Sequence, residues 1–412
     1  MRLGLREDAQ KIIDSAINAA LPHTAVKKAI EGIDFSGGKL VLVSIGKAGW
    51  SMAKAASDLL GDRIDDGVVI TKYDHSEGDL PNIRIFEAGH PVPDENSFKA
   101  TDEVIRLVSN LSADDKVLFL VSGGGSALFE RPIISSDELE DITEQLLASG
   151  ANIVEINTIR KRLSAVKGGK FAKLCEPAYV YSIILSDIIG DPLDMIASGP
   201  AYPDSSTYDE ALLIAQKYNI NMSSEVKELL SKETPKSLTN VTTKVTGSVT
   251  QLCMAAEKTC KELGYKPLVL TASLCCEARE AGSFLASIAE YYKDTKESLA
   301  FIAGGETVVR VKGKGLGGRN QEIALGAAEQ LSKLNNVAVF SVGSDGTDGP
   351  TDAAGGYVDN NTKEILKKQN IDIHEILDNN DAYNGLKACN GLIITGPTGT
   401  NVNDLSVLLI KR

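Results

Sequence analysis

The sequence predicts an α/β protein built of two domains. Apolar, β-branched runs of strand length alternate with helical patterns along the whole chain, which favours sheets with helices on their faces. The 412 residues exceed the roughly 100–200 residues that one core ordinarily serves. A polar segment at 231–247, which contains Pro235 and has no helical periodicity, separates two such series. We therefore expect domains at 1–235 and 236–412, with a cleft between them.

The first series predicts a largely parallel, Rossmann-like sheet. Residues 6–31 show helical spacing that is interrupted near Pro22, which indicates one or two helices before the first strand. Helical patterns separate most of the strands that follow. These are expected at 40–45, 67–71, 83–87, 117–121 and 180–185.

The second series predicts another α/β domain. Helices are expected at 250–263, 277–291 and 320–331. Strands are expected at 267–271, 299–303, 307–311, 337–342, 392–395 and 405–410.

Charge and composition exclude several classes of partner. Asp and Glu number 56 against 43 Lys and Arg, and the net charge of -13 has the wrong sign for binding nucleic acid or an anionic membrane. The N-terminus lacks the apolar core of a signal peptide, and no apolar run approaches the roughly 18 residues of a membrane span. We expect a cytoplasmic protein. Its six scattered cysteines are expected to be buried and reduced, with a reactive Cys275-Cys276 pair as the alternative.

Two glycine-rich loops follow strands of the first domain. The run Ser122-Gly123-Gly124-Gly125-Ser126 comes directly after strand 117–121, at the carboxyl end where α/β proteins bind ligands. Its backbone N–H groups and hydroxyls predict an anion cradle, with a plain turn as the alternative. Lys47 stands between glycines after strand 40–45 and predicts a phosphate or carboxylate contact, with an ordinary surface lysine as the alternative.

A basic loop precedes the predicted helix at 320–331. It formally contains GxGxxG, but two lysines fall within the turn. The next strand ends near Asp345, about 27 residues past the last glycine rather than the roughly 20 of a dinucleotide site. Lys312, Lys314 and Arg319 indicate a phosphate clamp instead, because a guanidinium suits bidentate binding of a phosphoryl group. A solvated basic turn is the alternative.

Aspartates follow one strand of each domain. Oxygen ligands in glycine-containing loops suit Mg²⁺, whereas Asp is also a common turn residue. The predicted metal ligands are Asp187 and Asp191 after strand 180–185, and Asp345, Asp348 and Asp352 after strand 337–342.

Taken together, eight segments resemble class II glycerate kinase, in family order across nearly the whole chain. They are SIGKAGWSMAKAA, GHPVPDENS, VSGGGSAL, INTIRKRLSAVKGGKFA, LSDIIGDPLDMIASGP, GGETVVRVKGKGLGGRNQE, SVGSDGTDGPTDAAGG and GPTGTNVNDL. The resemblance implies a C-terminal MOFRL domain with a mixed sheet. It also implies ATP-dependent phosphorylation of D-glycerate to 2-phosphoglycerate with Mg²⁺, in non-phosphorylative sugar degradation.

The resemblance assigns roles residue by residue. The family's catalytic lysine and arginine correspond to Lys47 and Arg319, which would bind the transferring phosphoryl group and the glycerate carboxylate. Asp187 or Asp191 would accept the glycerate hydroxyl proton, and the other aspartates would hold Mg²⁺. Substrate or phosphate contacts are expected at Ser122, Gly123, Gly124, Gly125, Ser126, Lys312, Lys314 and Asn320.

Two other functions stay open on the sequence alone. The same family has also been labelled hydroxypyruvate reductase, which would be an NAD(P)H-dependent oxidoreductase. A sensor of small acids or nucleotides is the non-enzymatic alternative. The chain departs from its relatives at Leu274-Cys275-Cys276, where they often carry Gly-Glu after the leucine. The sequence also leaves open whether the protein forms a homodimer.

Overall fold

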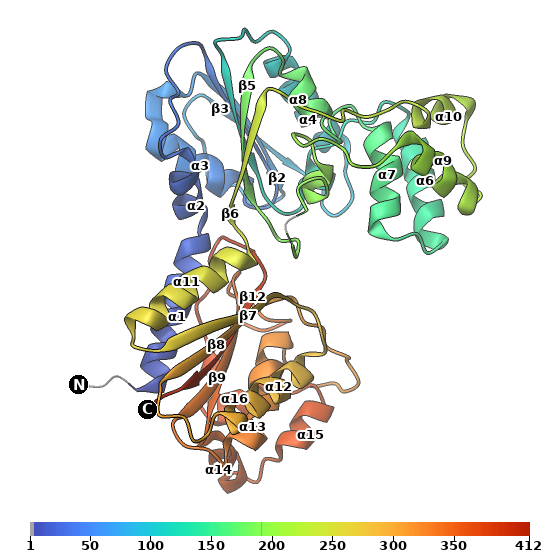
Figure 1. The fold of residues 1–412 in the computed structure, drawn as a ribbon. Helices are drawn as coiled ribbons and strands as arrows, with labels where there is room; N and C mark the ends of the chain where they lie inside the picture. The colour runs from blue at the N-terminus through green and yellow to red at the C-terminus, as the bar shows by residue number, and fades with distance from the viewer. Residues whose placement is uncertain (1–3, 191) are drawn as a thin grey trace. The chain divides into compact units, whose positions relative to one another are not determined.

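The computed structural model describes residues 4–190 and 192–412, which form two compact units (Figure 1). One unit runs from Ala25 to Ser186 and, after an interruption at residues 187–190, continues to Thr246. The other consists of the chain up to Thr24, residues 187–190 and residues 247–412. In the described part of the chain, no helix is both long and apolar enough to cross a membrane.

The N-terminal unit contains a six-stranded sheet of order β3-β2-β1-β4-β5-β6. Strands β1 to β5 pair in parallel, and the order reverses direction between β1 and β4, as it does in the Rossmann fold. The Rossmann-like prediction is therefore confirmed. The strands are β1 (Leu40–Ile45), β2 (Asp66–Lys72), β3 (Ile83–Ala88), β4 (Lys116–Val121), β5 (Tyr179–Leu185) and β6 (Val241–Gly247).

Helices cover both faces of this sheet, which explains why β1 is buried along its whole length. Met52 and Ala53 of α3 pack on one face, and Ala100 and Val104 of α4 pack on the other. Four further helices (α6, α7, α9 and α10) form a separate cluster around Leu146, as Figure 1 shows. The helices are α2 (Pro22–Ile30), α3 (Gly49–Leu60), α4 (Glu95–Val108), α5 (Gly125–Leu128), α6 (Ser136–Ala148), α7 (Ile153–Leu163), α8 (Lys170–Leu174), α9 (Tyr208–Lys217) and α10 (Ser224–Leu230).

The C-terminal unit contains a mixed sheet of order β11-β10-β9-β12-β8-β7. Strands β7 and β8 are parallel, whereas the remaining neighbours are antiparallel, so the predicted mixed sheet is confirmed. The strands are β7 (Lys266–Leu274), β8 (Leu299–Gly305), β9 (Val337–Gly343), β10 (Gly355–Asp359), β11 (Leu392–Ile393) and β12 (Asp404–Ile410).

Helices α1 and α11 lie side by side on one face of this sheet, and α12 and α13 lie on the other (Figure 1). Ile12 and Ile13 of α1 share a core with Cys253 and Cys260 of α11, so the first helix of the chain belongs with the C-terminal sheet. In this respect the two units differ from the predicted division at 235/236. The helices are α1 (Leu5–Ala20), α11 (Val249–Glu262), α12 (Ala278–Tyr291), α13 (Arg319–Leu331), α14 (Thr362–Lys368), α15 (Ile373–Asp378) and α16 (Ala382–Ala388).

The predicted strand at 307–311 is wrong. Its β-branched residues favour extended chain, but Val308 and Val311 are exposed and only an isolated bridge joins Val308 to Glu277. The backbone amides are taken by a loop instead, since Val308 donates to the Cys276 carbonyl at 3.1 Å. The segment therefore runs beside the sheet as a loop that lines a pocket.

Candidate active site

In the N-terminal unit, the loops after β1 and β4 meet at the point where the strand order reverses. The Lys47 amide donates to the Gly123 carbonyl at 2.8 Å. The Ser122 hydroxyl donates to the Ile45 carbonyl and accepts from the Ala48 amide, both at 3.1 Å. Because doubly wound sheets bind ligands at this point, the two predicted loops form one candidate site.

Close packing explains the glycines of these loops. A Cβ on Gly46 (φ +109°) would lie 2.3 Å from the Ser122 hydroxyl oxygen. A Cβ on Gly124 (φ +85°) would lie 2.9 Å from the His90 ring and 3.2 Å from Cγ of Lys47. The structure thus brings His90 beside the Lys47 side chain. Burial and the nearby Lys47 charge lower the pKa of His90.

Further polar residues support the β4 loop. The Ser126 hydroxyl lies 3.0 Å from that of Ser198, which donates to Asn157 Oδ1 at 3.3 Å. Ser198 and Asn157 are buried, and sequence reasoning missed both. They lie in two of the segments that carry the family resemblance, which is the one signal that could have found them.

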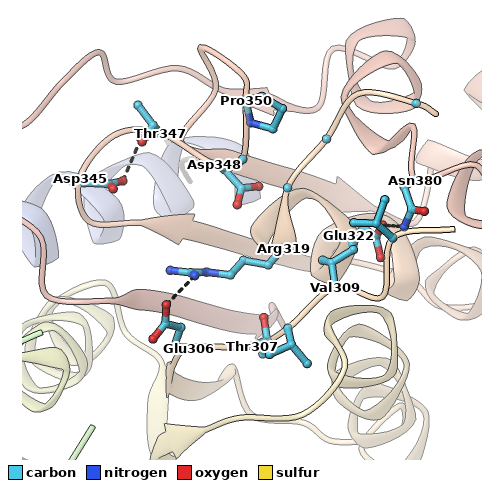
Figure 2. Close-up of a pocket in the computed structure, with 16 residues that line it drawn as sticks. Glu306, Thr307, Val309, Arg319, Glu322, Asp345, Thr347, Asp348, Pro350 and Asn380 are labelled. Carbon is cyan, nitrogen blue, oxygen red and sulfur yellow. Dashed lines mark hydrogen bonds and ion pairs between the residues drawn. The ribbon is translucent and has the colours of Figure 1, made fainter. Parts of the chain in front are cut away.

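In the C-terminal unit, Arg319 begins helix α13 and is held by two carboxylates. Its guanidinium donates to both oxygens of Asp404, from Nε at 2.6 Å and from Nη2 at 3.1 Å. Nη1 donates to Glu306 at 2.8 Å, as Figure 2 shows. Arg319 therefore has a fixed orientation.

The sheet register explains how Asp404 reaches Arg319. Asp404 is the first residue of β12 and pairs with Gly305 at the end of β8 and with Gly343 at the end of β9. Its carboxylate is buried, which raises its pKa, and the hydrogen bonds and charge of Arg319 oppose that rise. Burial lowers the pKa of Arg319, but Asp404 and Glu306 outweigh burial and leave that pKa above its ordinary value.

Arg319 lies in a pocket of about 690 Å³ that Glu306, Glu322, Asp345 and Asp348 also line (Figure 2). Asp345 and Asp348 were predicted metal ligands, and the structure brings these two to the same pocket. Glu306 was missed, because its position depends on where β8 ends.

Asp348 caps helix α13. Its buried carboxylate accepts from the Asn320 amide at 3.1 Å and from the Gln321 amide at 2.9 Å. Burial raises its pKa to about 6, although these hydrogen bonds lower it. Asn320, a predicted substrate contact, is buried and its side chain also donates to Asp348.

The predicted basic clamp is anchored through its backbone. The amides of Lys312 and Gly313 donate to Asn380 Oδ1 at 2.7 and 2.9 Å, and the Lys314 amide donates to Asn379 Oδ1 at 3.2 Å. These amides are therefore already bonded within the protein. The Lys312 and Lys314 side chains are exposed, and neither residue belongs to the lining of the Arg319 pocket.

The other predicted metal ligands lie elsewhere. Asp352 is exposed and accepts from the Tyr383 hydroxyl at 2.8 Å. Asp187 is half-buried, and its carbonyl accepts from Asn403 Nδ2 at 2.9 Å. Asp191 lies outside the described residues. Within the described ranges, no three His, Cys, Asp or Glu side chains converge as a metal cluster.

The carboxylates of the Arg319 pocket suit Mg²⁺ as a partial ligand set. Mg²⁺ typically binds through one or two carboxylates together with substrate phosphates and waters, so it does not require a dedicated cage of protein ligands. Glu306 and Asp345 offer carboxylates in one pocket with Arg319. Both oxygens of Asp348 already accept amide hydrogen bonds, which makes it a weaker ligand.

Two family models match the chain. Residues 8–231 match a domain of unknown function (DUF4147), and residues 299–404 match the MOFRL family. The two matched ranges include residues of both compact units.

Individual relatives are similar over their full length. D-glycerate 2-kinase of Thermotoga maritima is 52% identical, and the match covers 98% of each chain. Glycerate 2-kinase of Pyrococcus horikoshii is 39% identical over 99% of this chain and 98% of its own. A protein of Agrobacterium vitis, 36% identical over 98% of this chain and 94% of its own, has the provisional name hydroxypyruvate reductase.

Two solved structures share the fold. A crystal structure of glycerate kinase from Thermotoga maritima superposes with a TM-score of 0.93 at 52% identity and covers 99% of both chains. The crystal structure of a Pyrococcus horikoshii protein has a TM-score of 0.94 at 38% identity, and the match covers 100% of this chain and 99% of that one. The chain therefore belongs to the class II glycerate kinase family, in which a DUF4147 domain is joined to a MOFRL domain.

Proposed function

We propose that this protein transfers the phosphoryl group of ATP to D-glycerate and releases ADP and 2-phosphoglycerate. The observation that carries the proposal is the 52% identity to a D-glycerate 2-kinase along 98% of both chains. The reaction consumes a nucleotide, so a cytoplasmic location is the natural one. Formation of 2-phosphoglycerate agrees with the predicted role of the protein in non-phosphorylative sugar degradation.

Lys47 and Arg319 carry the charge in this proposal. Phosphoryl transfer asks the protein mainly to position the reactants and to neutralise charge on the transferring group. Arg319 uses three hydrogen bonds to Asp404 and Glu306, and a guanidinium has further N–H groups for an oxyanion. Lys47 supplies a second cation beside the Ser122–Ser126 loop, where a carboxylate or phosphate can also meet backbone N–H groups.

Mg²⁺ would neutralise charge on the nucleotide phosphates when it is bound. Glu306 and Asp345 are the residues of the Arg319 pocket that we propose to hold it. One oxygen of each is bound within the protein, Glu306 Oε1 by Arg319 and Asp345 Oδ1 by the Thr347 amide, whereas both oxygens of Asp348 accept hydrogen bonds. Asp187 and Asp191 remain the proposed acceptors of the hydroxyl proton. His90, beside Lys47, is a further group that could move a proton, since its lowered pKa favours the neutral ring near pH 7.

Nicotinamide chemistry is the less favoured function. The order of β1 to β6 is that of dinucleotide-binding domains, and one relative has a reductase name. However, the first β-α turn reads Gly46-Lys47-Ala48-Gly49 and lacks the GxGxxG that brings a backbone against pyrophosphate.

One set of assays tests the proposal. Purified protein with D-glycerate, ATP and Mg²⁺ should release ADP, and ³¹P NMR of the product should show 2-phosphoglycerate. Oxidation of NADH with hydroxypyruvate, without ADP release, would replace the kinase by the reductase. Binding of glycerate or ATP with neither turnover would favour a sensor, and 3-phosphoglycerate would move the reaction to the other hydroxyl.

A further inference from the structure

Lys167 is a fully buried lysine of the N-terminal unit whose ammonium is held from three sides. It donates to the Ser126 carbonyl at 2.7 Å and to the Phe129 carbonyl at 3.1 Å. The carboxylate of Glu130 forms an ion pair with it at 3.4 Å. Burying a cation is costly, so a lysine kept at this position must make interactions that an apolar side chain could not.

One of the two carbonyls belongs to the last residue of the glycine-serine loop, and the other lies three residues beyond it. Ser126 lies within α5 (Gly125–Leu128), and Phe129 is the residue that ends it. The Lys167 ammonium therefore binds one carbonyl within this short helix and one at its end. The other end of the same helix is the Ser122–Gly124 turn, which contacts the Lys47 loop.

The two residues after Lys167 fix a second loop. The amides of Gly168 and Gly169 donate to the carbonyls of Ser198 and Gly199 at 3.0 and 2.7 Å. Ser198 is itself in the left-handed region at φ +60°, which a non-glycine residue rarely adopts without support from its surroundings. Its hydroxyl contacts the Ser126 hydroxyl at 3.0 Å.

Ser126 is thus held at its carbonyl and at its hydroxyl. Its carbonyl binds Lys167, and its hydroxyl binds a serine that the backbone next to Lys167 orients. Gly125 has no room for a side chain, because a Cβ there would lie 2.8 Å from Cβ of Ala197. The loop therefore depends on the 167–169 segment for its position.

The charge partner of Lys167 is buried as well. Glu130 also forms an ion pair with Arg160 at 3.5 Å, and among the described residues neither of its carboxylate oxygens has a hydrogen-bond partner. Burial lowers the pKa of Lys167 to about 8, against the opposing charge of Glu130. Two carbonyl acceptors and a nearby carboxylate fix the orientation of this ammonium, which is fully buried.

We propose that Lys167 is a positioning residue for phosphoryl transfer, which acts by orienting Ser126 and the Ser122–Ser126 loop without contacting the substrate itself. This inference rests on the proposed function. Small displacements of a positioned group are expensive in catalysis, and about 1 Å can cost on the order of 100-fold in rate.

Lys170 provides a matched control three residues along the chain. Its ammonium donates to three carbonyls, those of Lys161, Arg162 and Ser164, at 3.0, 3.2 and 2.6 Å. Burial lowers its pKa to about 8 as well. Its acceptors close the end of α7 rather than the Ser122–Ser126 loop, so Lys170→Met removes a similar lysine from a different place.

The test compares Lys167→Met, Lys170→Met and Ser126→Ala, alone and in pairs, by urea unfolding and by steady-state turnover of ATP and D-glycerate. Both lysine variants should lose stability. Lys167→Met should lower kcat about 100-fold, with a smaller change in the KM for ATP, under conditions where circular dichroism shows folded protein. Lys170→Met should leave kcat within a few-fold of wild type.

Coupling to Ser126 identifies the route of the effect. If Lys167 acts through the Ser126 hydroxyl, Lys167→Met should lower kcat much less in the Ser126→Ala background than in wild type. An undiminished effect in that background assigns the action to the loop backbone, because alanine keeps the carbonyl that Lys167 binds. The two lysine variants lowering kcat alike would overturn the inference. If Lys167→Met does not fold, Lys167→Gln, which keeps N–H donors without the charge, carries the same comparison.

The wild-type enzyme separates this inference from the proposed function. Wild type that releases no ADP with D-glycerate refutes the proposed function. Active wild type with an unimpaired Lys167→Met variant refutes only the role of Lys167.

Discussion

Asp404 binds two nitrogens of Arg319 and so restricts that side chain to one orientation. A bidentate carboxylate gives both strength and geometric definition to an arginine. The residue that acts on the phosphoryl group in this account therefore depends on a second residue that does not need to touch it.

We predict that Asp404→Asn lowers kcat/KM for ATP by roughly 10- to 100-fold, because one of the two hydrogen bonds to Arg319 is lost along with the negative charge. Steady-state kinetics measure this. Asp378→Asn is the control, since Asp378 forms an exposed pair with Arg279 in the same unit. Equal, small effects of the two substitutions would show that Asp404 does not position Arg319.

The cysteines allow a second test, which concerns the burial of individual thiols. Cys175, Cys253 and Cys260 are buried, and burial raises the pKa of each thiol, to about 12 for Cys253 and Cys260. Cys275 and Cys276 are exposed. Native protein treated with iodoacetamide should therefore be labelled at these two first, as read by mass spectrometry. Early labelling of Cys175 would contradict the burial described for it.

Some residues of the candidate site could be predicted from the sequence, and others could not. Lys47 and Ser122–Ser126 follow apolar strands directly, so parallel-sheet topology alone brings their loops together. Asp404 and Glu306 reach Arg319 through the antiparallel register of β12, which no local pattern contains. The basic pattern at 312–319 gave the charges but not the hydrogen bonds from Asn379 and Asn380 that anchor the loop.

Helix α13 is the element on which the Arg319 site is built, and its first turn depends on Asp348. The aspartate comes from the loop after β9 and accepts amide hydrogen bonds from Asn320 and Gln321. A carboxylate at a helix N-terminus is favoured by the dipole, but here it is also removed from water.

This cap should make stability depend on pH. The pKa of Asp348 rises from 3.8 to about 6 on folding, so the stability linked to this group is complete below pH 4 and is lost as pH rises through 6. The loss is on the order of 2–3 kcal/mol at about 1.4 kcal/mol per unit. Urea unfolding at pH 4 to 7 should show wild type losing stability relative to Asp348→Asn across that window.

The exposed Asp352 in the same loop supplies the comparison. The difference in stability between wild type and Asp352→Asn should vary much less with pH. A difference between wild type and Asp348→Asn that stays constant from pH 4 to 7 would show that Asp348 titrates alike in the folded and unfolded chains.

Elements with strong periodicity were predicted correctly, and those set by tertiary contacts were not. Strands β1, β4 and β9 are continuous apolar runs, which identifies them without reference to partners. Strand β6 lies in the polar segment that was interpreted as the domain boundary, and β10 begins with two glycines packed closely against neighbouring chain. The stretch at 307–311 has the composition of a strand but no neighbouring strand to pair with.

At the scale of the whole molecule, Lys47 and Arg319 belong to different compact units. Lys47 follows β1 of the parallel sheet, and Arg319 begins α13 on the mixed sheet. The N-terminal helix α1 packs with the C-terminal sheet, and residues 187–190 also belong to that unit. Neither unit is therefore a single continuous stretch of chain. Family membership was predictable from motifs that occur in family order. The assignment of α1 to the C-terminal unit was not, because it depends on the packing of the apolar face of α1 against α11.

In the proposed function, one reaction needs both Lys47 and Arg319. ADP release from ATP, Mg²⁺ and D-glycerate tests this most directly, measured for wild type, Lys47→Ala, Arg319→Ala and the double variant, with unfolding curves to show that each is folded. We expect a loss of about 100-fold or more for each single variant and a double variant little worse than either, as for residues that act as a unit. Near-normal turnover by either single variant would contradict it.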